Sequence, residues 1–140
     1  MNATEERTRT GGCLCEAVRF AVTGPLREVL ICHCGQCRRQ HGHAAAFTNA
    51  PRKRVRFLEE RGLAWYRSSE SAERGFCREC GSCLFWRRVG SQTLSVTAGS
   101  LDQPTGLACA AHVFTAWKGD YYEIAEDGLM RCSEWRHPTR

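Results

Sequence analysis

The sequence predicts an all-β domain built from short antiparallel strands and hairpins, stapled by zinc. Short apolar segments recur along the chain, bounded by Gly, Pro and Asn turn signals, and no long helical period interrupts them. The 140 residues also include ten cysteines, most of them in closely spaced sets. Clustered thiols are typical of metal sites or of disulfide frameworks. We therefore expect short strands that act as a scaffold for the cysteines.

Length and composition limit the organisation of the chain. Its 140 residues predict one domain, and 42% hydrophobic with 25% charged residues is ordinary for a soluble globular protein. We expect a flexible N-terminal lead over residues 1–10, a single zinc-binding domain over residues 11–140, and a tail from about residue 131. The net charge of +5 suits an anionic small molecule and gives little support to nucleic-acid binding.

The expected cellular compartment determines whether the cysteines form disulfides or bind metal. The segment from Met1 to Thr10 is polar and lacks an apolar signal-peptide core, and no apolar run approaches the ~20 residues of a membrane span. We expect a cytoplasmic protein without membrane or nucleic-acid partners. In a reducing cytosol, clustered cysteines indicate metal or redox chemistry more than disulfides. A thioredoxin-type redox pair needs a βαβ setting, and the pattern shows none.

The first half of the chain reads as strands joined by turns. Gly11 opens a strand whose apolar positions Val18, Phe20 and Val22 alternate with other residues up to the Gly24 turn. The pair Cys13 and Cys15 would share one face of this strand. Further strands are expected at residues 26–31, 44–48, 54–58 and 63–67, with one short helical turn at residues 38–43.

The second half begins with a Gly-Phe-Cys-Arg-Glu-Cys-Gly segment at residues 75–81. A CxxC followed by glycine is the pattern of a zinc knuckle, a tight turn whose thiols face the metal. The remaining strands are expected at residues 84–89, 93–98, 110–117 and 121–124, with a loop at 99–106. The chain therefore predicts hairpins to its end.

One CxC and one distant CxxC together supply four thiols, those of Cys13, Cys15, Cys77 and Cys80. Four thiolates make a closed tetrahedral zinc site, which is structural because it has no open position. This site would tie the N-terminal strand to the middle hairpin. The alternative is that these cysteines are free or form disulfides.

The central segment Cys-His-Cys-Gly-Gln-Cys places Cys32, Cys34 and Cys37 within six positions. Cys32 and Cys34 would point to one side of a strand, and Gly35 could turn the chain back through a positive φ. Three converging thiols form a soft metal site, and three protein ligands leave one position open. The alternatives are a closed zinc site and an iron–sulfur cluster. In the closed site the fourth ligand would be His33, His41 or His43.

These motifs resemble those of one known family. The segments at residues 11–18, 32–39 and 76–82 are similar to those of the glutathione-dependent formaldehyde-activating (GFA) family, whose domain also occurs in centromere protein V. The His-Val-Phe at 112–114 and Lys-Gly-Asp-Tyr-Tyr at 118–122 resemble the family's later segment. The resemblance runs from about residue 11 to residue 124.

The resemblance implies a β-tent fold and two zinc ions per chain. By this resemblance, Cys13, Cys15, Cys77 and Cys80 bind a structural zinc, and Cys32, Cys34 and Cys37 bind a second, labile zinc. It implies a carbon–sulfur lyase whose reaction joins formaldehyde to glutathione as S-hydroxymethylglutathione. The expected partners are therefore a small thiol and an aldehyde. The alternatives are a non-catalytic zinc module that carries the thiol adduct and a protein-interaction domain.

The expected chemistry assigns roles to further residues. The open zinc would activate a substrate thiol as thiolate, and the aldehyde carbonyl would be the electrophile. Arg38 and Arg39, with Lys118, are predicted to bind the substrate, since guanidinium groups pair well with carboxylates. His33 and His41 are the predicted proton donors for the product alkoxide.

The sequence also departs from the family pattern. Cys83 stands where relatives usually carry proline or a small polar residue. We expect it to be a small buried residue or to approach one of the zinc ions. Cys109 and Cys132 lie outside the motifs, and the chain is shorter than the founding enzyme.

Overall fold

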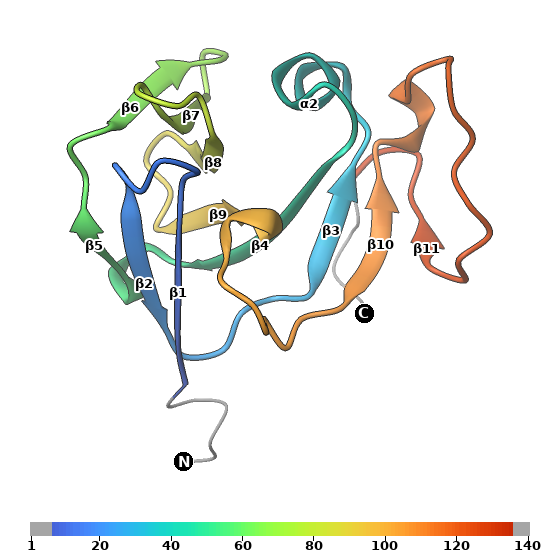
Figure 1. Ribbon diagram of the computed structural model, residues 1–140. Coiled ribbons are helices and arrows are strands. Elements are labelled where there is room, and N and C mark those ends of the chain that lie inside the picture. Colours follow the sequence, from blue (N-terminus) through green and yellow to red (C-terminus); the bar gives the residue numbers. More distant parts are fainter. Residues whose placement is uncertain (1–6, 136–140) are drawn as a thin grey trace. The chain divides into compact units, whose positions relative to one another are not determined.

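The computed structural model describes residues 7–135, which form a mostly β structure with one short α-helix (Figure 1). The chain divides into two compact units. The first unit contains the described residues up to Arg27 together with Thr48–Gly106, and the second contains Glu28–Phe47 together with the chain from Leu107 onward. No helix in residues 7–135 is long and apolar enough to cross a membrane. The predicted β class is thus confirmed.

A three-stranded antiparallel sheet opens the first unit. Its strands are β1 (Thr8–Gly12), β2 (Arg19–Thr23) and β5 (Val55–Glu59), in the order β1-β2-β5. The prediction of one strand through residues 11–22 is wrong, because the chain reverses between β1 and β2. The Cys13 N–H donates to the Val18 carbonyl at 3.0 Å, and Glu16 has a left-handed φ of 68°. The first cysteine pair therefore lies in a hairpin loop.

An antiparallel meander completes the first unit. It consists of β6 (Leu63–Arg67), β7 (Ala72–Cys77), β8 (Cys83–Arg88) and β9 (Thr93–Thr97). Buried Phe85 of β8 packs edge-on against Phe20 of β2, with ring centroids 5.1 Å apart. A Cβ on Gly75 would lie 3.0 Å from the rings of Phe85 and Trp65, so a larger residue would require these rings to shift. This core holds the hairpins that carry the cysteines.

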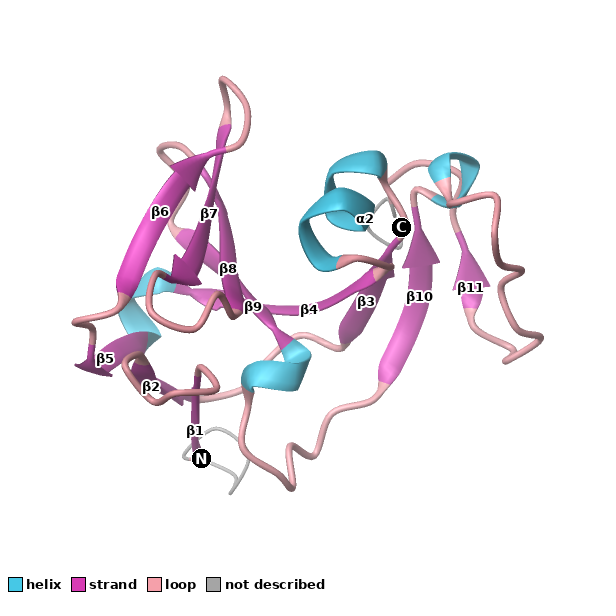
Figure 2. Cartoon of the chain, turned by 45° about the horizontal axis from the view of Figure 1, so that its top comes forward, coloured by secondary structure: helices cyan, strands magenta, loops and turns pink. Residues whose placement is uncertain are grey.

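The second unit contains a mixed sheet (Figure 2). Its order is β11 (Met130–Arg131), β10 (Cys109–Val113), β3 (Val29–Cys32) and β4 (Ala45–Pro51), and the last of these continues into the first unit. β3 pairs with β4 antiparallel, whereas β10 runs parallel to both β3 and β11. The sheet is therefore not wholly antiparallel as predicted. Leu30, Ala111 and Val113 form its buried cluster.

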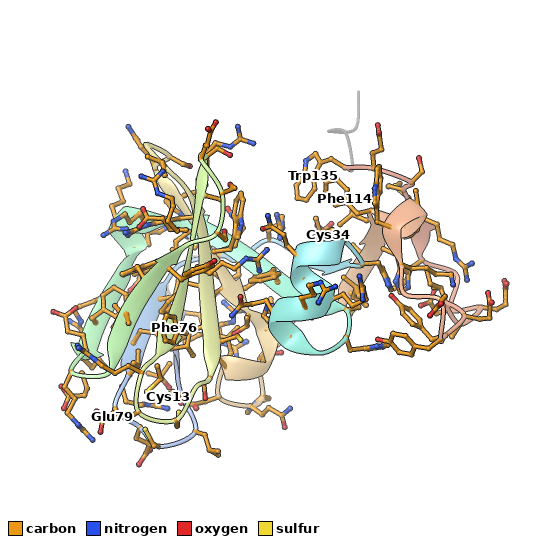
Figure 3. All side chains as sticks on the ribbon, turned by 90° about the horizontal axis from the view of Figure 1, so that it is seen from above. Cys13, Cys34, Phe76, Glu79, Phe114 and Trp135 are labelled. Carbon is orange, nitrogen blue, oxygen red and sulfur yellow. The ribbon has the colours of Figure 1, made fainter. Side chains whose placement is uncertain are left out.

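One α-helix, α2 (Gly35–His41), and three 3₁₀ turns, η1 (Arg52–Arg54), η2 (Ala98–Ser100) and η3 (Thr115–Trp117), complete the described chain. The helical turn predicted at 38–43 therefore begins three residues earlier. The strand predicted at 110–117 ends at Val113, because Phe114 adopts a left-handed conformation with φ of 55°. Its ring centroid is 5.9 Å from that of Trp117 and 6.0 Å from that of Trp135, and Figure 3 labels Phe114 and Trp135.

One expectation about a strand near the C-terminus is wrong. Residues 121–124, predicted as a strand, have turn and irregular backbone. The expected tail is in part ordered against β10: the Cys132 N–H donates to the His112 carbonyl and the Phe114 N–H to the Glu134 carbonyl, both at 2.8 Å. At the other end, β1 begins at Thr8, inside the lead predicted for residues 1–10, of which residues 1–6 lie outside the described chain.

Candidate metal centres

Four thiols of the first unit converge on one point. The sulfur atoms of Cys13, Cys15, Cys77 and Cys80 all lie within 4.8 Å of one another. The Cys15 sulfur is 3.8 Å from the sulfurs of both Cys13 and Cys77. Cys13 lies at the same edge of the unit as the turn that carries Glu79 (Figure 3), and the Leu14 N–H donates to the Ser82 hydroxyl at 3.1 Å. Two hairpin loops thus supply two thiols each.

The backbone around these thiols forms tight turns. After Cys80 the chain passes through Gly81, whose φ of 80° suits glycine, and the Gly81 N–H donates to the Cys77 carbonyl at 2.7 Å. On the other loop, the Val18 N–H donates to the Cys13 sulfur at 3.2 Å. A hydrogen bond from the Ser82 hydroxyl, 3.1 Å away, lowers the pKa of the Cys80 thiol to about 5. The Ser82 hydroxyl therefore favours thiolate at Cys80, whereas desolvation and the side chains of Cys80, Cys13 and Cys77 raise the pKa of Cys15 to about 12.

Three thiols of the second unit form a separate group. The sulfurs of Cys32, Cys34 and Cys37 lie within 4.8 Å of one another. Cys32 ends β3, Cys34 caps the N-terminus of α2, and Cys37 lies in its first turn, where its N–H donates to the Cys34 sulfur at 3.3 Å (Figure 3). The expected positive φ at Gly35 is wrong, since this residue begins the helix. The helical turn itself brings Cys37 back.

Charge within this group is shared unevenly. Hydrogen bonds from the side chains of Cys32 and Cys37 lower the pKa of the Cys34 thiol to about 2. Hydrogen bonds with the side chains of Cys34 and Cys37 raise the pKa of Cys32. The helix N-terminus adds partial positive charge beside Cys34. The arrangement stabilises thiolate, the form in which cysteine binds metals.

Both donor sets fit zinc. Four converging thiols match a closed tetrahedral site, and three match a site with one position left for another ligand. Within residues 7–135 no histidine or carboxylate joins either group of sulfurs. The sets that the sequence predicted are thus the sets that the structure brings together.

The three histidines considered as a fourth ligand have other partners. His33, only 3% exposed, has its Nδ1 2.6 Å from the Tyr122 hydroxyl and its Nε2 2.8 Å from His112 Nδ1. The Nδ1 atom of His43 lies 2.5 Å from the Tyr121 hydroxyl. The His41 ring packs edge-on against Phe47 with centroids 5.6 Å apart.

A buried polar chain continues from His33. His112, on β10 and 6% exposed, has its Nε2 2.7 Å from an Asp127 carboxylate oxygen. Burial, together with the charges of His112, His43 and Lys118, lowers the pKa of His33 to about 4, so this ring is neutral at pH 7. Sequence patterns assigned no catalytic or ligand role to His112, Tyr122 or Asp127. The only available signal was that two of them lie in the later segments of the GFA-like pattern.

The three predicted substrate-binding cations differ in their surroundings. Arg38 follows Cys37 on α2, and its Nε is buried without a hydrogen-bond partner. Arg39 is exposed. Lys118 Nζ donates to the carbonyl of Tyr122 at 2.6 Å and lies 5.2 Å from that ring's centroid. Arg38 is therefore the cation with a donor still to satisfy, whereas Lys118 supports its own loop.

The other cysteines lie outside both groups. Cys83 begins β8, Cys109 is exposed on β10, and Cys132 packs against the buried cluster around Leu30. Because these three cysteines lie outside both thiol groups, substitutions of them can serve as controls for substitutions within the groups.

Comparison with known proteins identifies the family. Residues 8–117 match the family model described as glutathione-dependent formaldehyde-activating enzyme. This chain belongs to the GFA family. The matched segment includes both cysteine groups and His112, whereas Tyr122 and Asp127 lie beyond it.

Two other proteins are similar to this GFA family member. A Schizosaccharomyces pombe (strain 972 / ATCC 24843) protein named as an uncharacterized lyase is 32% identical over 122 residues, which cover 86% of this chain and 88% of the relative. A Rhodobacter sphaeroides protein, solved by crystallography as a structural genomics target, is 25% identical. It superposes with a TM-score of 0.58 over 71% of this chain and 97% of that chain.

Proposed function

We propose that this protein is a zinc-dependent carbon–sulfur lyase of the GFA type. It would form or cleave the adduct of glutathione, or of another small thiol, with formaldehyde or a related aldehyde. The observation that carries the proposal is the group of Cys32, Cys34 and Cys37, three converging thiols that no further residue within 7–135 completes. A set of three protein ligands is the arrangement of catalytic rather than structural zinc.

The two groups take different roles in this proposal. Cys13, Cys15, Cys77 and Cys80 would hold a structural zinc, since four thiolates leave no position for substrate. Cys32, Cys34 and Cys37 would hold the second zinc, which supplies a place where the substrate sulfur is kept as thiolate. Thiolate ligands suit zinc more than magnesium, calcium or manganese.

The chain's own residues would then bind and orient the substrate. The buried Nε of Arg38 lacks a partner, so a substrate carboxylate would satisfy it through a charge-assisted hydrogen bond. Arg39, exposed on the same helix, would add charge. Lys118 already donates to two backbone carbonyls, so its proposed role narrows to shaping the loop around Tyr122.

Cleavage of the adduct requires one proton transfer. As the carbon–sulfur bond breaks, sulfur keeps the electron pair, the carbonyl forms, and the adduct's hydroxyl proton leaves; synthesis is the reverse. Both ring nitrogens of His33 are already engaged, which disfavours it as the direct partner of that proton. Of the two histidines predicted for this role, His41 is therefore the one that we propose.

The test is the exchange rate of the formaldehyde–glutathione equilibrium, measured by NMR with and without protein. We expect the zinc-loaded protein to accelerate exchange and Cys34→Ser to remove the acceleration. Cys109→Ser is the matched control, because this exposed thiol belongs to neither group. Glutathione binding without faster exchange would contradict the lyase proposal and indicate a carrier. No binding at all would favour an interaction domain.

A further inference from the structure

Four side chains of the second unit form one continuous hydrogen-bonded chain. Asp127 Oδ2 lies 2.7 Å from His112 Nε2, His112 Nδ1 lies 2.8 Å from His33 Nε2, and His33 Nδ1 lies 2.6 Å from the Tyr122 hydroxyl. The two histidines are buried, whereas the Asp127 side chain is 34% exposed. These hydrogen bonds thus connect the partly exposed Asp127 carboxylate to His33, which lies between two cysteines of the three-thiol group, and end at Tyr122.

The carboxylate gives this chain a direction. The hydrogen bond to His112 keeps the pKa of Asp127 below its ordinary value, so the carboxylate is ionised and only accepts. His112 must then carry its proton on Nε2, and its Nδ1, when the ring is neutral, accepts from His33 Nε2–H. His33 Nδ1 is left to accept from the Tyr122 hydroxyl. Each tautomer therefore follows from the one before it.

His33 is also held by a hydrogen bond from its backbone. The His33 N–H donates to the Val113 carbonyl at 3.0 Å, and the parallel pairing of β3 with β10 places Cys32 opposite Val113. His33 is thus fixed at its peptide and at both ring nitrogens, directly between Cys32 and Cys34. Because neighbouring residues share one backbone, fixing His33 restricts where both thiols can point.

We propose that Asp127 and His112 are positioning residues for the three-thiol group: they hold His33 in one tautomer and orientation, and so preform the Cys32–Cys34 geometry that binds a metal ion. The proposal rests on the proposed function in requiring that this group binds zinc. It assigns a role to a carboxylate that follows the last predicted site residue and lies outside the three-thiol group.

Two variants of Asp127 have different effects on the hydrogen bonds. One reverses the direction in which protons are donated, and the other breaks the series. Asp127 Oδ1 accepts from the Leu129 N–H at 3.0 Å, so in Asp127→Asn this contact would retain the amide oxygen and turn the amide nitrogen toward His112. His112 Nε2 would then have to accept, and both histidine tautomers would invert while the chain stays continuous. Asp127→Ala would instead remove the acceptor and break the chain.

Two readouts test the proposal on the zinc-loaded protein. Long-range ¹⁵N–¹H NMR spectra report the tautomers of His33 and His112, which a merely structural role would not invert. Competition with a chromophoric chelator reports zinc affinity at the three-thiol group, with the four-thiol group as internal reference. We expect Asp127→Asn to invert both tautomers, and Asp127→Ala to weaken the second zinc by about tenfold or more, as losses around metal ligands do.

Glu126→Gln is the matched control, since it removes a 98% exposed carboxylate one residue away. It should leave both tautomers and both zinc affinities unchanged. Tyr122→Phe removes only the far end of the chain and should weaken the second zinc less than Asp127→Ala does. This variant also reports on the chain if Asp127→Ala fails to fold.

Several results would overturn the proposal. These are unchanged tautomers in Asp127→Asn, a cationic His112, an unchanged second zinc in Asp127→Ala, or a larger loss in Tyr122→Phe than in Asp127→Ala. A wild-type protein that loads only the four-thiol group would instead contradict the proposed function. The wild-type zinc content therefore distinguishes the two failures.

Discussion

The two cysteine groups contain the same ligand atoms but are assembled in different ways. The four-thiol group joins two hairpin loops, and 62 positions separate Cys15 from Cys77. The three-thiol group is complete within six consecutive residues at the junction of β3 and α2. Closing a long loop restricts the unfolded chain more than closing a short one. A metal ion in the first group would therefore stabilise the fold, whereas one in the second group would exchange at little cost to the fold.

The largest expected effect is that of Cys77→Ser compared with Cys34→Ser. Cys77 is fully buried in the four-thiol group, and structural zinc in small peptides contributes ~10–16 kcal/mol. We expect Cys77→Ser to lose cooperative thermal unfolding. Cys34→Ser should stay folded, since serine also caps helices well. Circular dichroism melts measure both, and equal losses would reverse the roles assigned to the groups.

Chelation tests the same contrast without mutation. We expect a mild chelator to remove about one equivalent of zinc while the circular dichroism spectrum persists, because three protein ligands hold a metal less firmly than four. Elemental analysis before and after treatment gives the stoichiometry. Iron in place of zinc, or no metal in protein purified under reducing conditions, would contradict the assignment.

A smaller effect is expected at the cations beside the three-thiol group. Arg38→Ala should weaken glutathione binding by about tenfold or more, since charge-assisted hydrogen bonds contribute ~1.5–3 kcal/mol. Exposed Arg39→Ala should change it by less than about threefold. Zinc content should be unchanged in both variants, and calorimetry measures the affinities.

S-methylglutathione serves as the matched ligand in this measurement. It should bind far more weakly than glutathione, because a thioether cannot become a thiolate. Equal affinities for the two ligands would show that sulfur does not reach the three-thiol group.

The smallest effect concerns an ion pair that stabilises β1 and β2 of the first unit. Asp102 accepts hydrogen bonds from Arg19 of β2 and Thr10 of β1, both at 2.6 Å. Its side chain is 49% exposed, so the pair should contribute less than about 1 kcal/mol. Asp102→Asn should lower the melting temperature slightly, and the difference should shrink in high salt because exposed ion pairs are screened. A difference that is independent of salt would show that packing, rather than charge, is involved.

The predictable part of the site is the part that is local in sequence. The cysteines within each segment could be grouped from their spacing, because CxC and CxxC segments place their sulfurs together with few backbone choices. The distant CxC and CxxC could be paired because together they supply the four thiols of a closed zinc site. The exact extent of β6 was also predictable, since Gly62 precedes it and its apolar residues are contiguous. Composition and turn signals therefore determine the scaffold to a good approximation.

The buried histidine chain was not predictable in this way. His33 and His112 are 79 positions apart, and they meet because β10 pairs with β3 in one parallel register that local patterns do not specify. Residues 121–124 have the aromatic composition of a strand, yet the Tyr122 hydroxyl is at His33 and the backbone stays irregular. The turn at Gly35 was misjudged because the N-cap of the helix is a cysteine, Cys34, and not one of the usual cap residues.

The cap of α2 makes one sulfur atom serve two structures. Cys34 accepts the Cys37 N–H of the first turn and also belongs to the three-thiol group. A helix of seven residues is too short to persist by itself in water. We therefore expect the thiols to separate when this helix unwinds. The rate of amide hydrogen exchange at Cys37 and Arg38 would then report how often the three-thiol group opens. Protection of these two amides against exchange would also measure how slowly the group releases a bound metal ion.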